Sequence, residues 1–329
     1  MRTAAAVYDR LAADMQLVAA PFDNLPGWER EDHRELVALL ETHGSLSQSA
    51  VRHDARATLE QTFQLFRVSD ADGVAVAGHL TGYFEPVLQG SRNRSDIYRY
   101  PVFGRPDELR DVASDADAMY FTRREIEDGA LNGRGLELFW LADPVDCFFL
   151  HVQGSGRIHF DDGTMVDCAF AGKNGHAYTS IGKHLVAIGE IASEDISLET
   201  LRAWLTQRPD EARHVMQRND SYIFFDLREV DPAEEALRTG PPGAAGIPLI
   251  PTRSLAVDAD FHPLGRVMYV VSEPLGIARL MLAHDVGSAI RGPARGDVYC
   301  GTGDAAGRRA GAMNHAASFF VLLPREATG

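Results

Sequence analysis

Residues suited to acid–base chemistry gather near the C-terminus, where three aspartates lie in strand-forming segments flanked by glycine. Asp258, Asp285 and Asp297 stand out because aspartate is depleted in β-strands. Turn formation is one explanation, since aspartate stabilises turns with its own side chain. The other is a carboxyl held on a rigid strand, where partial desolvation raises its pKa until it acts as an acid near neutral pH. Asp297, between Gly296 and Val298, needs the second explanation most.

Other catalytic and binding templates are incomplete. The three cysteines, Cys147, Cys168 and Cys300, show no zinc spacing, and a Cys147–Cys168 disulfide stays open as an alternative. The glycine-rich run 301–307 has one residue too many for a dinucleotide loop, and too little chain follows it for a βαβ unit. No HExxH motif occurs. We therefore expect the protein to need no metal and no organic cofactor.

Charge and hydropathy exclude two classes of protein. Among 329 residues, 47 Asp and Glu against 32 Lys and Arg give a formal net charge of −15. This balance argues against a nucleic-acid binder and against a polybasic membrane-surface protein. No apolar run reaches the ~18 residues of a transmembrane helix. Charged residues interrupt the N-terminal apolar stretch, which therefore does not match a secretory signal. A sugar polymer bound mainly by hydrogen bonds fits this composition.

The elements that must position these residues follow from periodicity and from chain breakers. We expect the first 66 residues to be helical, with helices over 29–43 and 55–66, and further helices over 122–129, 180–191, 198–205 and 210–219. Strand-forming runs predict strands over 74–84, 136–142, 147–153, 156–160, 164–170 and 221–225. Five more, separated by glycines as in a compact barrel, are expected over 254–258, 266–271, 278–285, 296–300 and 318–323. Residues 100–105 predict a turn, and residues 240–251 predict the strongest boundary in the chain.

Seven motifs, in order along the chain, resemble the membrane-bound lytic murein transglycosylase A (MltA) family, whose C-terminal segment is called the 3D domain after three aspartates. They are LTGYFEP (80–86), YPVFGRP (100–106), HVQGSGR (151–157), AGKNGHAYTSIGK (171–183), NDSYIFF (219–225), GIPLIPTRSLAVD (246–258) and DVGSAIRG with GDVYCG (285–301). The resemblance covers most of the chain, and motifs of this length in this order are highly specific.

The resemblance implies a mainly β fold with helices, organised in two domains. One is a double-psi β-barrel formed by residues 1–99 and 240–329, which includes the 3D segment. The other is a β-rich domain inserted at residues 100–239, with a glycan groove between the two. The expected turn at 100–105 and the boundary at 240–251 fall where such an insertion begins and ends.

The activity that the resemblance implies is lytic transglycosylation of peptidoglycan, a carbon–oxygen lyase reaction on a polysaccharide. The β-1,4 bond between N-acetylmuramic acid and N-acetylglucosamine is cleaved without water, and the product carries a 1,6-anhydro ring. Asp297 matches the catalytic position and would act first as acid and then as base, which needs a partly desolvated site. Asp285 would be the supporting carboxyl, and Asp258 a structural or turn residue.

The family motifs also indicate which residues would bind the glycan. For each of these residues, the alternative is a structural role in a turn, a helix cap or the core. A loop at the groove is expected from Thr81, Gly82 and Tyr83. A turn of the inserted domain, facing that loop, is expected from Gln153, Gly154 and Ser155. Three further polar residues are candidates for hydrogen bonds to N-acetyl and hydroxyl groups: Asn174, Tyr178 and Ser221.

Two other classes of function stay open. An ordinary two-carboxylate glycosidase, with Asp285 or Glu85 as the second acid, would release a hydrolysis product instead of an anhydro sugar. A non-catalytic glycan-binding or wall-scaffolding protein would release no soluble fragments. The resemblance implies peptidoglycan glycan strands as ligand and cell-wall synthesis or division proteins as partners. It also implies a periplasmic protein whose precursor is anchored to the outer membrane, although neither a leader nor a lipidated cysteine is visible. We expect a monomer that binds no nucleic acid.

Overall fold

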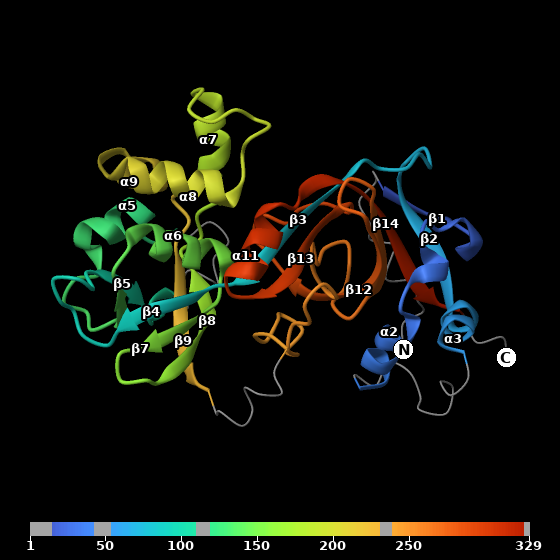
Figure 1. Ribbon diagram of the computed structural model, residues 1–329, viewed down its shortest axis with the longest axis horizontal. Helices are drawn as coiled ribbons and strands as arrows, with labels where there is room; N and C mark the ends of the chain where they lie inside the picture. Colours follow the sequence, from blue (N-terminus) through green and yellow to red (C-terminus); the bar gives the residue numbers. More distant parts are fainter. Residues whose placement is uncertain (1–14, 43–53, 110–118, 231–238, 326–329) are drawn as a thin grey trace. The chain divides into compact units, whose positions relative to one another are not determined.

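The computed structural model describes residues 15–42, 54–109, 119–230 and 239–325, which form two compact units (Figure 1). Unit 1 comprises residues 1–82, 242–299 and 313–329, and unit 2 comprises residues 83–241 and 300–312. The chain therefore passes four times from one unit to the other. A compact unit is defined by its internal contacts, whereas a domain could also fold alone. The domain boundaries at 99/100 and 239/240 accordingly stay a prediction.

Unit 1 is built on a closed six-stranded barrel. Its strands are β3 (Gly78–Glu85), β10 (Ser254–Val257), β11 (Val267–Ser272), β12 (Ile277–Val286), β13 (Arg295–Thr302) and β14 (Asn314–Pro324). They pair in the order β14-β11-β12-β10-β13-β3, and β14 pairs again with β3, which closes the ring. The pair β10–β12 is parallel. Closure leaves no unpaired edge in the ring, and β2 (Phe63–Asp70) and β1 (Met15–Ala19) continue the sheet from β14.

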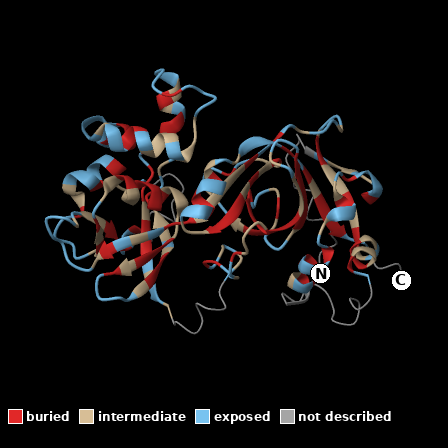
Figure 2. Cartoon of the chain, viewed as in Figure 1, coloured by how far each residue is buried: buried red, intermediate tan, exposed pale blue. Residues whose placement is uncertain are grey.

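Alternating side chains give the barrel two apolar faces. Figure 2 shows that many residues along the barrel strands are buried. Val270 and Met281 belong to one cluster with Leu255 and Phe319, which fills the inside of the barrel. The neighbouring Leu280 belongs to a second cluster on the outer face. That outer cluster packs against the helices α2 (His33–Thr42) and α3 (Ala55–Thr62) and the short turns η1 (Phe22–Asn24) and η2 (Trp28–Arg30). The helices thus cover only one part of the outer wall, over β11, β12 and β14.

Unit 2 contains a second, nearly closed sheet. Its strands are β5 (Tyr100–Phe103), β6 (Glu137–Leu141), β4 (Val87–Ser91), β7 (Gly156–Phe160), β8 (Met165–Lys173) and β9 (Ile223–Glu229), in that spatial order. A single bridge between Gly104 and Phe225 connects the two ends of the sheet. The helices of this unit are α5 (Arg123–Glu125), η3 (Ile126–Ala130), α6 (Pro144–Gln153), α7 (Ile181–Ala187), α8 (Leu198–Gln207), α9 (Pro209–Met216) and α11 (Asp304–Gly311). An apolar cluster joins α6 to α7, α8 and α9.

Most predicted elements are present. The five C-terminal strands, the strands at 156–160 and 164–170 and the helices that begin after Ser180 and Ser197 all form. Thr122 and Glu125 make the predicted capping box, with hydrogen bonds in both directions. A hairpin at 161–163 joins the two strands, β7 and β8. All three cysteines are free, so the Cys147–Cys168 disulfide is not formed.

Four expectations are wrong. Residues 147–153 lie in helix α6 and not in a strand, because Asp143 caps the helix, Pro144 opens it and Gly154 closes it in the left-handed conformation. Residues 100–103 form strand β5 and not a turn; Pro101 is tolerated because β5 lies at the edge of its sheet. The expected helix over 55–66 ends at Thr62, where β2 begins, and residues 15–19 are strand β1.

No described helix is long and apolar enough to cross a membrane.

Candidate active site

The register of the barrel brings two of the three aspartates onto one row of the sheet. Ala256 of β10 pairs with Asp297 of β13 on one side and with Asp285 of β12 on the other. Paired residues of neighbouring strands point to the same face, so both carboxyls flank the small side chain of Ala256. Leu255 and Val298, one residue along, belong to the inner core, so the two carboxyls lie on the outer wall. Two strand spacings place their backbones about 10 Å apart.

A β-bulge in the pairing of β10 with β12 puts Asp285 on this row. Leu255 pairs with Ala283, but the next residue, Ala256, pairs with Asp285 and not with His284. One extra residue on β12 therefore shifts the side-chain alternation by one position. Asp285 Oδ1 also accepts a hydrogen bond of 3.0 Å from the backbone N–H of Ala244, in the Pro- and Gly-rich segment 240–251. The bulge and this hydrogen bond hold the Asp285 carboxyl on the same row as the Asp297 carboxyl.

Asp297 is half-buried and held by a short chain of hydrogen bonds. Thr81 Oγ1, on the neighbouring strand β3, donates to Asp297 Oδ1 at 2.5 Å. Arg295 Nη2 in turn donates to Thr81 Oγ1 at 2.6 Å. Burial is the main reason that the pKa of Asp297 is raised above its ordinary value, and Asp285 adds to the rise; Thr81, Arg295 and His79 act in the opposite direction. The result is a carboxyl whose neutral form is favoured, as an acid catalyst requires.

Asp258 has the geometry of a turn-stabilising residue. It is 4% exposed, and its Oδ2 accepts a hydrogen bond of 2.8 Å from the backbone N–H of Gly292. Its Oδ1 accepts a second from the N–H of Asp260 at 3.2 Å and lies 3.5 Å from the guanidinium of Arg291. These contacts join the loop after β10 to the loop before β13. The third aspartate therefore supports the backbone around the row and does not lie on it.

The motif at 80–86 lies in a strand, as the strand-forming run at 74–84 predicted, and the loop suggested for Thr81, Gly82 and Tyr83 is not formed. Leu80 to Glu85 belong to β3, and Thr81 pairs with Asn314 across the β3–β14 ladder that closes the barrel. Thr81 and Gly82 belong to unit 1, while Tyr83 is the first residue of unit 2. Alternation along β3 turns Thr81 to the outer wall and Leu80 to the core. The structure thus brings Thr81, but not the expected loop, to Asp297.

In unit 2, the side chain of Gln153 makes a hydrogen bond within the protein. It is the last residue of α6, and its Oε1 accepts a hydrogen bond of 3.0 Å from the backbone N–H of Phe84. Gly154 follows with a φ of 80°, the left-handed conformation that ends the helix, and Ser155 leads into β7. The side chain of Gln153 therefore fastens the end of α6 to the last part of β3.

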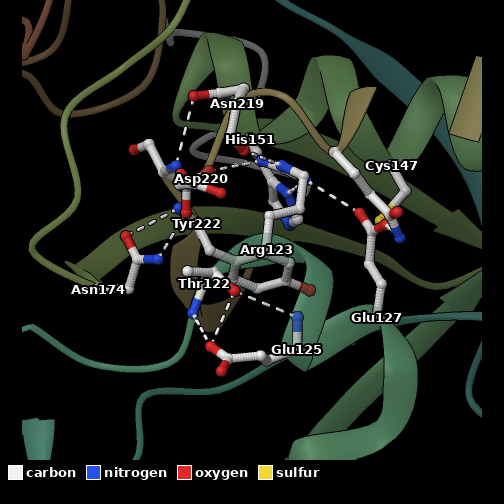
Figure 3. Close-up of polar contacts among 12 residues, drawn as sticks. Thr122, Arg123, Glu125, Glu127, Cys147, His151, Asn174, Asn219, Asp220 and Tyr222 are labelled. Atoms are coloured by element: carbon white, nitrogen blue, oxygen red, sulfur yellow. Dashed lines mark hydrogen bonds and ion pairs between the residues drawn. The ribbon is translucent and has the colours of Figure 1, made fainter. Parts of the chain in front are cut away.

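Asn174 holds loops of unit 2 together (Figure 3), and so does Ser221 through its backbone carbonyl. Asn174 is fully buried, and its amide nitrogen donates to the carbonyls of Phe121 and Asp220 at 2.9 and 2.8 Å. Its amide oxygen accepts from the N–H of Tyr222 at 2.9 Å. The carbonyl of Ser221 accepts from the buried Arg123 at 2.8 Å. Each polar atom of the Asn174 amide thus has a backbone partner.

Tyr178 is half-buried, and burial is the main reason that the pKa of its hydroxyl is raised. Among the residues that the structure describes, no group of three His, Cys, Asp or Glu side chains is arranged to hold a metal ion.

Arg295 is a residue of the candidate site that the sequence did not indicate. It lies two positions before Asp297 on β13, so the two side chains share a face. The alternation of side chains along a strand was therefore the signal that could have indicated Arg295. Its partner Thr81 lies 214 residues away in the chain, so the sequence could not show the contact that makes Arg295 relevant.

Together, these features define a two-part β protein whose closed barrel carries a desolvated acid on its outer wall. Comparison with known proteins identifies its family. Residues 79–226 match the family model described as the MltA specific insert domain, and residues 253–323 match the 3D domain. The chain belongs to the MltA family.

Individual relatives agree with this assignment. The chain is 36% identical over 248 residues to membrane-bound lytic murein transglycosylase A of Vibrio cholerae, covering 71% of this chain and 62% of that protein. It is 35% identical over 260 residues to the Escherichia coli K12 protein of the same name, covering 76% of this chain and 66% of that protein. The match therefore spans somewhat less than two thirds of these curated relatives.

Solved structures share the fold over nearly the whole chain. A membrane-bound lytic murein transglycosylase from Agrobacterium tumefaciens superposes with a TM-score of 0.82 at 35% identity, covering 95% of this chain and 98% of that one. E. coli MltA with bound chitohexaose gives a TM-score of 0.75 at 29% identity, with 94% of each chain covered. The fold is the MltA fold, with a six-stranded barrel and a second, nearly closed β part.

Proposed function

We propose that this protein is a lytic transglycosylase that cleaves the β-1,4 bond between N-acetylmuramic acid and N-acetylglucosamine in peptidoglycan. The observation that carries the proposal is the state of Asp297: burial raises its pKa, and Thr81 fixes one of its oxygens. Family membership supports it, since the relatives named above are murein transglycosylases. The bound chitohexaose in the E. coli structure supports a β-linked sugar polymer as the ligand.

A single carboxyl suffices for the reaction. Neutral Asp297 gives its proton to the glycosidic oxygen while the bond from C1 to that oxygen breaks. The resulting carboxylate takes the proton of the C6 hydroxyl of the same sugar as that oxygen bonds to C1, which closes the 1,6-anhydro ring. Asp297 ends protonated, and no water is consumed. Because the nucleophile belongs to the substrate, it is already held near C1 at high effective concentration.

Asp285 would support this cycle without transferring a proton. It lies on the same row as Asp297, with Ala256 between them, and it contributes to the raised pKa of Asp297. The same pair of carboxyls is the feature that favours the second candidate, an ordinary hydrolase with two carboxylates. The products separate the two, since an anhydro sugar is one water lighter than the hydrolysis product.

The setting follows from the substrate. Peptidoglycan lies outside the inner membrane, and the curated relatives are called membrane-bound, so we place this protein in the periplasm, associated with the outer membrane. Its partners would be glycan strands and the proteins of cell-wall synthesis or division.

The test is release of muropeptides from intact peptidoglycan, read by mass spectrometry, by the parent, Asp297→Asn, Asp285→Asn and Asp260→Asn. Asparagine keeps the shape and the acceptor of the carboxyl but cannot give or take a proton. Asp297→Asn should lose about 10²- to 10⁴-fold in turnover while still binding glycan. Asp285→Asn should lose less, and the exposed Asp260 is the matched control. An active Asp297→Asn variant would refute the mechanism, and products without the anhydro ring would identify the hydrolase.

A further inference from the structure

Three side chains on the outer wall of the barrel form a relay that leads to the acid. Arg295 and Asp297 lie two residues apart on β13 and so share a face. Thr81 lies beside them on the neighbouring strand β3. Its hydroxyl oxygen is 2.6 Å from Arg295 Nη2 and 2.5 Å from Asp297 Oδ1. The guanidinium and the carboxylate are therefore within about 5 Å of each other, with one hydroxyl between them.

The direction of the hydrogen bonds in this relay is fixed by chemistry. A guanidinium has five N–H donors and no acceptor, so Thr81 Oγ1 must accept from Arg295. The one proton of the Thr81 hydroxyl is then available only to Asp297 Oδ1. An oxygen that accepts this short bond is a poor place for the acid proton. Oδ2, the other oxygen of the same carboxyl, is therefore the better place for that proton.

We propose that Arg295 is a positioning residue for the acid–base cycle: through Thr81 it assigns the acid proton to Oδ2 of Asp297, and its charge offsets the negative charge that this carboxyl carries midway through turnover. The inference rests on the proposed function, because it assigns a role within that cycle. Arg295 is itself held in place, since its Nη1 donates to the carbonyls of Gly296 and His79. The contact through which it acts is the one with Thr81.

The charged groups around Asp297 come from three strands. Asp285 of β12 opposes ionisation, while His79 of β3 and Arg295 of β13 favour it. His79 is tied to β14 through Asn314 Oδ1 at 2.7 Å. Burial outweighs the groups that favour ionisation, so the pKa of Asp297 is raised above its ordinary value. A cation that acts through one hydroxyl leaves the carboxyl neutral at rest and still stabilises it once the proton has left.

Arg295→Gln tests this role, with Arg291→Gln as the matched control. Arg291 lies in the same segment, and its side chain is 68% exposed. Arg295→Gln should lower kcat about tenfold with KM little changed, since the lost interaction acts on the transition state. The alkaline limb of the pH–rate profile should move to higher pH, because the Asp297 carboxylate loses a stabilising charge. Arg295→Lys should restore part of kcat and move the alkaline limb part of the way back, and Arg291→Gln should match the parent.

A second measurement does not depend on turnover. The ¹³C-carboxyl resonance of Asp297, assigned by its loss in Asp297→Asn, should titrate with a higher midpoint in Arg295→Gln than in the parent. Thr81→Val removes the relay but keeps the charge, so it should also raise the midpoint, and Thr81→Ser should restore it. If Arg295→Gln does not fold, as judged by circular dichroism, Thr81→Val carries the test. An unchanged midpoint and an unchanged alkaline limb overturn the inference. A parent enzyme that releases no anhydro product overturns the proposed function instead, and the titration still decides the role of Arg295.

Discussion

In the proposed cycle Asp297 is neutral and then ionised within a single turnover, and the raised pKa that this cycle uses should be visible in the stability of the folded protein. Its pKa is raised by burial above the ordinary value of 3.8. Between the unfolded and the folded pKa, the unfolded chain has lost the proton while the folded protein keeps it. Stability is therefore lost as the pH rises through this window, and the penalty is complete above the folded pKa.

Asp297→Asn removes this penalty, because asparagine carries no charge at any pH. The variant should melt at a higher temperature than the parent at pH 7, and the difference should vanish toward pH 4. Thermal melts followed by circular dichroism from pH 4 to pH 8 measure it. A variant that is less stable than the parent at pH 7 would mean that the native site stabilises the carboxylate, contrary to the raised pKa.

Gln153 offers a second residue-level prediction, in which the structure changes the expected result. The family motif suggested that Gln153 lies in a glycan-binding turn, so that its loss would weaken glycan binding. Because Gln153 Oε1 accepts from the N–H of Phe84, Gln153→Ala leaves a half-buried donor without its partner. We expect the free energy of unfolding to fall by about 1 kcal/mol.

Urea denaturation measures that loss, and Gln153→Glu is the control because it keeps an acceptor oxygen in place. Equal stability of Gln153→Ala and the parent, together with weaker glycan binding, would return Gln153 to the role expected from the sequence.

The residues of the site differ in how far the sequence revealed them. Asp297 could be found, because aspartate in a strand-forming segment is unusual enough to need a reason. Thr81 was found only as part of a motif, and its link to Asp297 spans 216 residues. Asn174 and Ser221 stay predicted glycan-binding residues, and the structure adds that both join loops inside unit 2.

At the scale of elements, α2 is fastened to the barrel by a buried arginine. Arg253, which immediately precedes β10, is 1% exposed and pairs with Glu31 and Glu35 at the start of α2. It also donates to the carbonyl of Leu280 on β12 at 2.8 Å. Glu31 is only 3% exposed, so loss of the arginine would leave a buried carboxylate without this partner. Arg253→Ala should lower the free energy of unfolding by about 3–5 kcal/mol.

Chemical denaturation of the variant provides the measurement. Arg56→Ala is the control, because Arg56 pairs with Glu60 on the surface of α3 and such pairs contribute little. Similar losses in the two variants would show that burial of the Arg253 cluster adds nothing to the docking of α2.

The elements that the sequence predicted well are those bounded by clear signals. The C-terminal strands are short, β-rich and separated by glycines, and all five form. Helix α6 was mistaken for a strand because Phe148 and Phe149 pack against helices while Leu150 packs against the sheet. An element buried on all sides shows no period, so only its caps could identify it. Closure of the barrel by β3 and β14 joins residues more than 200 positions apart, beyond any local pattern.

For the molecule as a whole, the proposed chemistry uses only side chains and the substrate. The acid, the base and the nucleophile are all accounted for by Asp297 and the C6 hydroxyl. We therefore expect the rate of muropeptide release to be unchanged after incubation with a chelator and after addition of divalent ions. A loss of activity on chelation that a divalent ion restores would require a metal in the mechanism.

The four passages of the chain between its two units also determine how the protein comes apart when it is pulled. Residues 15 and 325, the first and last that the structure describes, both belong to unit 1. Tension applied between these two residues therefore acts first on unit 1, because residues 83–241 and 300–312 of unit 2 each lie between two stretches of unit 1. A force that draws the chain out from its N-terminal side reaches β3, with Thr81, before residues 83–241 of unit 2. A force from the C-terminal side reaches β14 and then α11 of unit 2 before it reaches Asp297, so the connectivity of the chain sets a different order of extraction from each side.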